Sequence, residues 1–174
     1  MNISVLLFSL LLSFSSIADH ELQTVNFVEV ERYLGKWYEI EKFPNNFQRN
    51  CEATQANYSQ MDNGRLRVIN KCKKSNGKIK TAKGSASIED TNTNAKLKVS
   101  FFFLQRWIGK ANYYIMALGS DYEYVLIGSP DRNFAWILSR TTTLDQKIID
   151  QLKLTAQSQG FEIERFKKTP TWID

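Results

Sequence analysis

The residue types that could carry out chemistry are few in this chain. Its single histidine is His20, and its only cysteines are Cys51 and Cys72. This set lacks the usual ligand spacing of a zinc site and leaves no positioned imidazole for a Ser-His-Asp arrangement. The chain also has no glycine-rich phosphate loop and no dinucleotide fingerprint. The sequence therefore predicts no catalytic residue, no metal site and no cofactor.

Paired carboxylates are the remaining route to acid–base catalysis. Glu39 and Glu41 alternate along a predicted first strand, which would place both side chains on one face. At the start of such a strand, carboxylates are more often rim or solvent groups. We therefore predict that the protein is not an enzyme.

The N-terminal segment has the composition of a secretory signal peptide. Residues 1–18 contain no charged side chain, and Val5 to Leu12 is an almost unbroken apolar run. Small residues at Ser16 and Ala18 predict cleavage after Ala18. A membrane anchor is the alternative, but the run is shorter than the ~20 residues of a span. A lipid anchor would need a cysteine at the cut site, and none precedes Cys51.

The mature chain, residues 19–174, is thus expected to be one domain that is soluble and extracytoplasmic. In a bacterium it would be periplasmic or associated with the outer membrane, and otherwise it would be secreted. It is not expected to be a lipoprotein.

Short alternating segments between turn signals predict a β-rich domain. Asn63-Gly64 tolerates positive φ at both centres of a type I′ turn, which predicts a hairpin from about Glu52 to Lys73. Lys96 to Phe101 alternates polar and apolar residues, as a half-buried antiparallel strand does. Further strands are predicted over 79–88, 112–118, 122–128 and 134–140. Their regular spacing favours a sandwich or a barrel.

One helix is expected near the C-terminus. Thr143 and Gln146 match a capping box, and Gly160 is placed to end the helix. One apolar stripe is formed by Leu144, Ile148, Leu152 and Ala156. Because only one face is apolar, the helix should pack against the outside of the sheet. Residues 161–166 are then predicted to form a short extra strand.

An ordered series of motifs resembles the lipocalin family, in particular the bacterial outer-membrane lipocalins, with apolipoprotein D as an animal relative. The series runs from Gly35-Lys36-Trp37-Tyr38 through Leu97-Lys98-Val99-Ser100-Phe101 to Trp136-Ile137-Leu138-Ser139-Arg140. The resemblance implies an all-β fold, an eight-stranded antiparallel up-and-down β-barrel with one C-terminal helix packed outside. Barrels of this kind can hold one small ligand.

The resemblance also implies a structural plug made by Gly35, Trp37 and Arg140. Trp37 would fill the closed end of the barrel, and Arg140 would lie across its indole. Such a cation–π contact contributes about 0.5–2 kcal/mol. The opposite end of the barrel would be the mouth.

A small hydrophobic ligand, carried or stored in the barrel, is the implied function, with a fatty acid or lysophospholipid as the expected class. Trp136 matches a pocket tryptophan of the family. The predicted ligand-binding residues are Phe101, Phe103, Trp107, Tyr113, Arg132, Phe134, Trp136 and Leu138. Except for Trp136, each aromatic could equally just fill the barrel. The cations Arg106, Lys110 and Arg132 could pair with an anionic head group or be solvated loop charges.

The two cysteines are expected to form one disulfide, because such bonds are typical of secreted proteins and related bacterial sequences have both residues. The predicted hairpin register complicates the pairing. If Asn63 and Gly64 are the two loop residues, Cys72 faces Gln55, and the first strand would need a bulge. Two buried free thiols are the alternative.

Charge and exposed apolar residues suggest the remaining contacts. The formal charge of +5 is too modest to imply nucleic acid. Six lysines from Lys71 to Lys83, with no acid among them, are either solvent-facing strand positions or a peripheral contact with anionic lipid. In the alternative function, a protein-interaction module, the loops around Phe47 and Trp107-Ile108 would bind a protein partner or dock on a membrane.

Overall fold

The computed structural model describes residues 21–101 and 112–173. The predicted signal peptide, residues 1–18, and His20 lie outside the described residues. So does the segment 102–111, which contains the predicted site residues Phe103 and Trp107 and the loop residues Arg106, Ile108 and Lys110.

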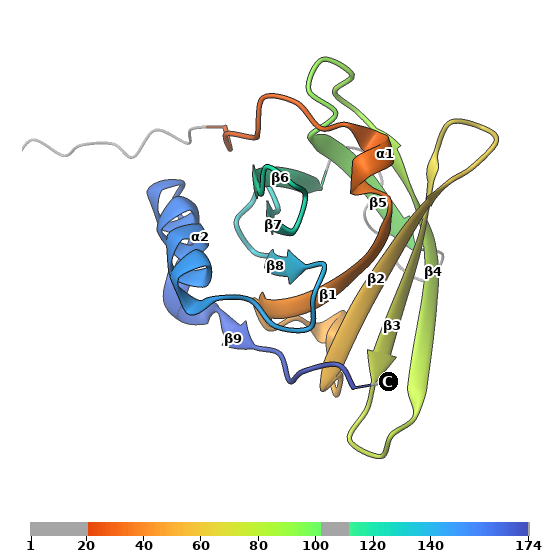
Figure 1. The fold of residues 1–174 in the computed structure, drawn as a ribbon, viewed down its shortest axis with the longest axis vertical. Coiled ribbons are helices and arrows are strands. Elements are labelled where there is room, and N and C mark those ends of the chain that lie inside the picture. Colours follow the sequence, from red (N-terminus) through yellow and green to blue (C-terminus); the bar gives the residue numbers. More distant parts are fainter. Residues whose placement is uncertain (1–20, 102–111, 174) are drawn as a thin grey trace, which may run out of the picture.

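Eight strands form a closed antiparallel barrel (Figure 1). Each strand pairs with the next one along the chain, and β1 pairs with both β2 and β8, which closes the sheet. The strands are β1 (Gly35–Lys42), β2 (Ala53–Gln60), β3 (Leu66–Lys73), β4 (Ile79–Ile88), β5 (Lys96–Phe101), β6 (Tyr113–Leu118), β7 (Tyr124–Gly128) and β8 (Ala135–Ser139). The predicted eight-stranded up-and-down barrel is confirmed.

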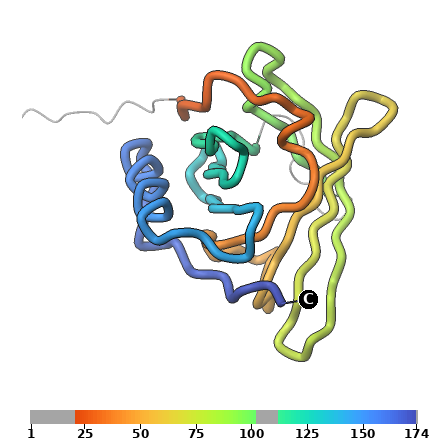
Figure 2. Tube along the Cα trace, in the orientation of Figure 1, coloured from red at the N-terminus to blue at the C-terminus, as the bar shows by residue number. Residues whose placement is uncertain are grey.

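The helix α2 (Gln146–Ser158) packs on the outside of the barrel, as predicted. Figure 2 shows α2 on one side of the barrel and the long strands β2 to β4 on the other. The N-cap of α2 is Asp145, whose carboxylate accepts a hydrogen bond from the Lys147 backbone N–H at 2.7 Å. The predicted cap at Thr143 is therefore wrong. Gly160 follows the helix with a φ of +85°, as the sequence predicts.

The segment after α2 differs from the prediction. Residues 161–166 contain a 3-10 turn, η2 (Ile163–Arg165), and only β9 (Lys167–Lys168) is extended, pairing with β1. Phe161 and Phe166 both pack on Phe43, with ring centroids 6.0 and 4.7 Å from it. An extended strand would direct positions five apart to opposite faces, so the two contacts require a turn.

The hairpin of β2 and β3 also corrects the predicted register. Met61 N–H bonds to the Arg65 carbonyl at 2.8 Å, which leaves a three-residue loop that ends at Gly64, with a φ of +77°. A three-residue loop with a glycine at this position is a common alternative to the two-residue turn. As a result Cys72 pairs with Thr54 rather than with Gln55.

One end of the barrel is covered by the short helix α1 (Val30–Tyr33), and Trp37 lies fully buried beneath it. The Arg140 guanidinium carbon lies 3.8 Å from the centroid of the Trp37 ring. The indole Nε1 donates to the Tyr33 carbonyl at 2.9 Å. A side chain added at Gly35, where φ is +93°, would begin 3.4 Å from Arg140 Nη1. The positions of Gly35, Trp37 and Arg140 are those that a plug of the closed end requires. That these residues act as a plug stays a prediction.

No helix among the described residues is long and apolar enough to cross a membrane.

Candidate ligand-binding cavity

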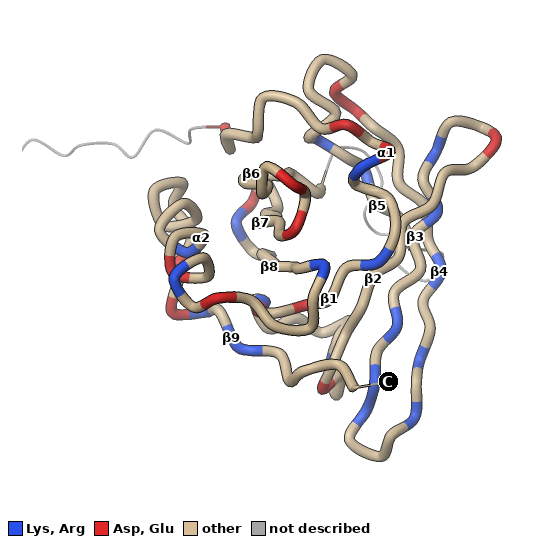
Figure 3. The backbone as a smooth tube through the Cα atoms, in the orientation of Figure 1, with Lys and Arg blue, Asp and Glu red and all other residues tan. Residues whose placement is uncertain are grey.

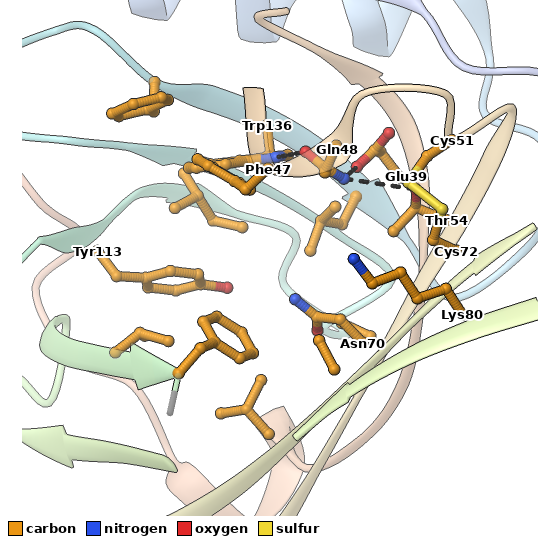
Figure 4. Close-up of a pocket in the computed structure, with 18 of the residues that line it drawn as sticks. Glu39, Phe47, Gln48, Cys51, Thr54, Asn70, Cys72, Lys80, Tyr113 and Trp136 are labelled. Atoms are coloured by element: carbon orange, nitrogen blue, oxygen red, sulfur yellow. Dashed lines mark hydrogen bonds between the residues drawn. A yellow bond between two sulfur atoms is a disulfide. The ribbon is translucent and has the colours of Figure 1, made fainter. Parts of the chain in front are cut away.

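A cavity of about 200 Å³ occupies the barrel toward the end opposite α1. It lies above the apolar layer that contains Trp37, and its walls come from inward-facing positions of the strands and from the loop between β1 and β2. Most of the wall is apolar, and a few polar side chains are placed around the mouth (Figure 4). This is the usual composition of a small-molecule site.

Five of the predicted ligand-binding residues line this cavity, namely Phe101, Tyr113, Phe134, Trp136 and Leu138. Period-two alternation directs Trp136 and Leu138 of β8, and Phe134 just before it, to the same side. The rings of Phe134 and Trp136 stack with their centroids 6.0 Å apart and their planes at 14°. Their contact with a ligand stays a prediction.

Arg132 lies elsewhere. It is not among the lining residues, and its Nε donates to the Gln159 carbonyl at 2.8 Å. A φ of +58° in the turn between β7 and β8 directs the side chain over Gly160, next to the end of α2. Its position does not support the predicted contact with a ligand head group.

Gln48 is a lining residue that the sequence did not single out. It ends the 3-10 turn η1 (Asn46–Gln48), which crosses the mouth. Its Oε1 accepts from Trp136 Nε1 at 3.1 Å, and its Nε2 donates to Glu39 Oε2 at 2.6 Å. Beside it, Phe47 lies 5.5 Å from Phe134. One amide thus fixes the loop, the indole and a carboxylate relative to one another.

Glu39 and Glu41 correct a further expectation, because they do not share a face. A β-bulge between them shifts the register of β1 against β8. Glu39 lines the cavity and its Oε1 lies 2.7 Å from Lys42 Nζ, whereas Glu41 meets Lys153 of α2 at 2.6 Å on the outside. Both carboxylates are buried and ion-paired rather than rim groups. A paired acid and base across the cavity is therefore not formed by these two residues.

Tyr58 and Tyr113 form the floor of the cavity, and their hydroxyls cluster with that of Tyr33. Tyr113 Oη lies 2.7 Å from Tyr33 Oη and 3.0 Å from Tyr58 Oη. Burial raises the pKa of Tyr58 to about 12 and raises those of Tyr33 and Tyr113 well above their usual range. The three phenols are therefore neutral at physiological pH and can act only as hydrogen-bond donors or acceptors.

A disulfide joins Cys51 and Cys72 at the mouth, as the first alternative predicted. The bulge expected in β2 is not needed, because Cys51 precedes the strand. Its backbone N–H bonds back to the Gln48 carbonyl at 3.0 Å, and this turn brings its Cα within 5.2 Å of the Cα of Cys72. The bond therefore ties the loop that carries Gln48 to β3.

Within residues 21–101 and 112–173, no group of three or more His, Cys, Asp or Glu side chains could hold a metal ion.

Comparisons with known proteins agree with this architecture. A family model described as a Lipocalin-like domain matches residues 28–171. The Outer membrane lipoprotein Blc of Escherichia coli (strain K12) is 38% identical over 143 residues, which cover 82% of this chain and 78% of Blc. Apolipoprotein D of Mus musculus is 40% identical over 150 residues, which cover 81% of this chain and 76% of that protein.

Among solved structures, insecticyanin from Manduca sexta superposes with a TM-score of 0.67 at 19% identity, over 88% of this chain and 86% of that chain. At this identity the likeness shows the fold alone. The family model and the two more similar sequences go further, because they match most of the chain in the order of its strands. The barrel with its outer helix is thus that of its relatives, and the chain belongs to the lipocalin family.

Proposed function

We propose that this lipocalin binds a small hydrophobic ligand in its barrel and carries or stores it outside the cytoplasm, without catalysis. The ligand class is a fatty acid or a lysophospholipid. The observation that carries the proposal is the apolar cavity itself, which is lined by aromatic and aliphatic side chains and reached from one end of the barrel.

An acyl chain suits this cavity on energetic grounds. Burying one methylene group contributes about 0.8 kcal/mol, so a chain of about ten carbons contributes about 8 kcal/mol before the entropy costs of binding. The neutral tyrosines of the floor carry no charge that would oppose an apolar tail. The polar groups at the mouth can face a head group.

Trp136 should report binding directly. Titration with a fatty acid is expected to quench the tryptophan fluorescence of the wild type, because the Trp136 ring forms part of the cavity wall. The Trp136→Phe variant should lose most of that quenching. Trp172→Phe is the matched control, since Trp172 is buried but does not line the cavity. The proposal fails if no acyl ligand produces quenching, heat or a thermal shift with the wild type.

Location outside the cytoplasm is part of the proposal. The bacterial relative is named an outer membrane lipoprotein, and the Cys51–Cys72 disulfide is typical of oxidising compartments. The charge-free segment 1–18 agrees with export.

Peripheral contact with an anionic membrane is proposed for the outer face of the β3–β4 hairpin. Lys71 and Lys83 are exposed on this face beside Ile79, which is 55% exposed. Figure 3 shows lysine and arginine along both strands, with few acidic residues near them. Basic residues contribute about 1 kcal/mol each near an anionic surface, and an exposed isoleucine can enter the interface. The charge therefore favours lipid head groups as the partner of this face.

Vesicle binding tests this contact. Wild-type protein is expected to sediment with vesicles that contain phosphatidylglycerol, and the Lys71→Gln/Lys83→Gln variant should bind them about thirtyfold more weakly. The variant Lys36→Gln/Lys147→Gln removes the same charge from exposed sites elsewhere and should bind like the wild type. Equal binding to uncharged phosphatidylcholine vesicles, or no binding to anionic ones, would contradict the contact.

The alternative, a protein-interaction module without lipid cargo, has less support from the described loops. Phe47, one of its expected contact residues, turns toward Phe134 and Trp136 and lines the cavity. Extraction of the purified protein with organic solvent separates the two functions. Recovered acyl chains support carriage, whereas a clean extract together with a captured protein partner supports the module.

A further inference from the structure

We infer that the β3–β4 wall of the cavity is a subsite for the anionic head group of the ligand, formed by Lys80, Asn70 and Lys74. This inference rests on the proposed carriage of an acyl ligand, and it adds a position and a charge preference. It also differs from the expectation from sequence, in which Arg106, Lys110 and Arg132 either pair with the head group or are solvated loop charges.

The strand register directs these side chains inward. Cys72 pairs with Lys80 and Asn70 pairs with Ala82, and all four residues line the cavity. Ile69 pairs with Lys83, which does not line the cavity and is exposed on the outer face. In Figure 4 the Lys80 side chain and the Asn70 amide extend into the cavity from the same wall. Lys74 follows β3 at the mouth.

The charge of the lining favours an anion. Its cations are Arg49, Lys74 and Lys80, and its one carboxylate is Glu39. Glu39 is already engaged, because its two oxygens meet Lys42 Nζ at 2.7 Å and Gln48 Nε2 at 2.6 Å. The mouth therefore has an excess of positive charge against otherwise apolar walls, which concentrates anionic ligands.

Asn70 supplies an independent observation. Its Oδ1 is buried and has no hydrogen-bond partner among the described residues. A buried acceptor without a donor costs about 1–3 kcal/mol, so a ligand hydroxyl at this point would be stabilising. A carboxylate or a phosphate can pair with Lys80, and a glycerol hydroxyl next to a phosphate can donate to Asn70 Oδ1.

The opposite wall explains the orientation. It consists of Phe134, Trp136 and Leu138, and the indole Nε1 of Trp136 already donates to Gln48. Below it the three tyrosine hydroxyls bond to one another. The acyl tail therefore lies along the aromatic wall toward the tyrosines, and the head group stays beside Lys80.

Matched ligands that differ only in head-group charge test the subsite. The wild type is expected to bind dodecanoate about tenfold more tightly than dodecanol, the size expected for one hydrogen bond to a charged group. Lys80→Gln should abolish this preference and leave the affinity for dodecanol unchanged. Lys83→Gln, on the outer face of the same strand, should keep the preference. Dodecanoyl lysophosphatidate distinguishes a phosphate from a carboxylate head, and Asn70→Leu should weaken its binding more than that of dodecanoate.

The failures of the subsite and of carriage are distinguishable. Equal affinity of the wild type for dodecanoate and dodecanol, or equal effects of Lys80→Gln and Lys83→Gln, would overturn the subsite while carriage stands. Binding of neither ligand would overturn both.

Discussion

Replacing Arg140 with alanine is expected to lower the free energy of unfolding by about 3 kcal/mol. The guanidinium donates to the carbonyls of Arg32 at 2.6 Å, Lys36 at 2.8 Å and Tyr122 at 3.2 Å. Its carbon also lies 3.8 Å from the centroid of the Trp37 ring. The variant loses all four contacts together and exposes the indole to water. Urea denaturation measures the change.

The loss should be large because one planar group connects three segments of the chain. It bridges the end of α1, the start of β1 and the turn before β7. Among the described residues, no other cation lies over the Trp37 ring. Arg140→Lys keeps the charge but not the fork, so it should recover only part of the stability. Arg67→Ala, at an exposed position of β3, should change stability by less than about 0.5 kcal/mol. An unchanged urea midpoint for Arg140→Ala would contradict the plug.

Much of the fold could be predicted from local patterns in the sequence. The strands over 79–88 and 96–101 were predicted with the bounds that the structure shows, because alternation and flanking turn residues act within a few positions. The errors occur where distant contacts decide. Phe161 and Phe166 converge on Phe43, far earlier in the chain, and this turns a predicted strand into η2.

The cavity residues could be predicted where local alternation places them, and could not where distant contacts do. Trp136 and Leu138 follow from the period of two along one strand, which identifies the inward face once a barrel is assumed. Gln48 does not, because it lies in an irregular loop whose position depends on contacts with Glu39 and Trp136. A one-residue bulge likewise separated Glu39 from Glu41, which strict alternation had placed together. Lys80 could have been predicted by alternation, because it lies two positions from Ala82 on β4 and therefore points to the same side, into the barrel.

Removing the disulfide is expected to lower the free energy of unfolding by about 3 kcal/mol, because the bond closes a loop with a sequence separation of 21. The variant Cys51→Ser/Cys72→Ser avoids an unpaired thiol, and the wild type under reducing conditions should behave in the same way. Urea denaturation of both provides the measurement. Equal stability of the oxidised and reduced wild type would contradict the prediction.

The same double variant also separates two effects of the disulfide, one on stability and one on ligand affinity. Constraint of the unfolded chain alone would change stability and leave ligand affinity as it was. Cys51, however, is three residues from Gln48, and its backbone N–H donates a hydrogen bond to the Gln48 carbonyl. The disulfide therefore also holds the loop that positions Trp136. We therefore expect the double variant to bind a fatty acid more weakly even where it is fully folded. Gln48→Ala, with the disulfide intact, should also weaken binding, and it should lower stability by about 1–3 kcal/mol because buried Glu39 loses a donor. Unchanged affinity in the double variant would show that the disulfide acts only by constraining the unfolded chain. The loop would then be held by the hydrogen bonds of Gln48 alone.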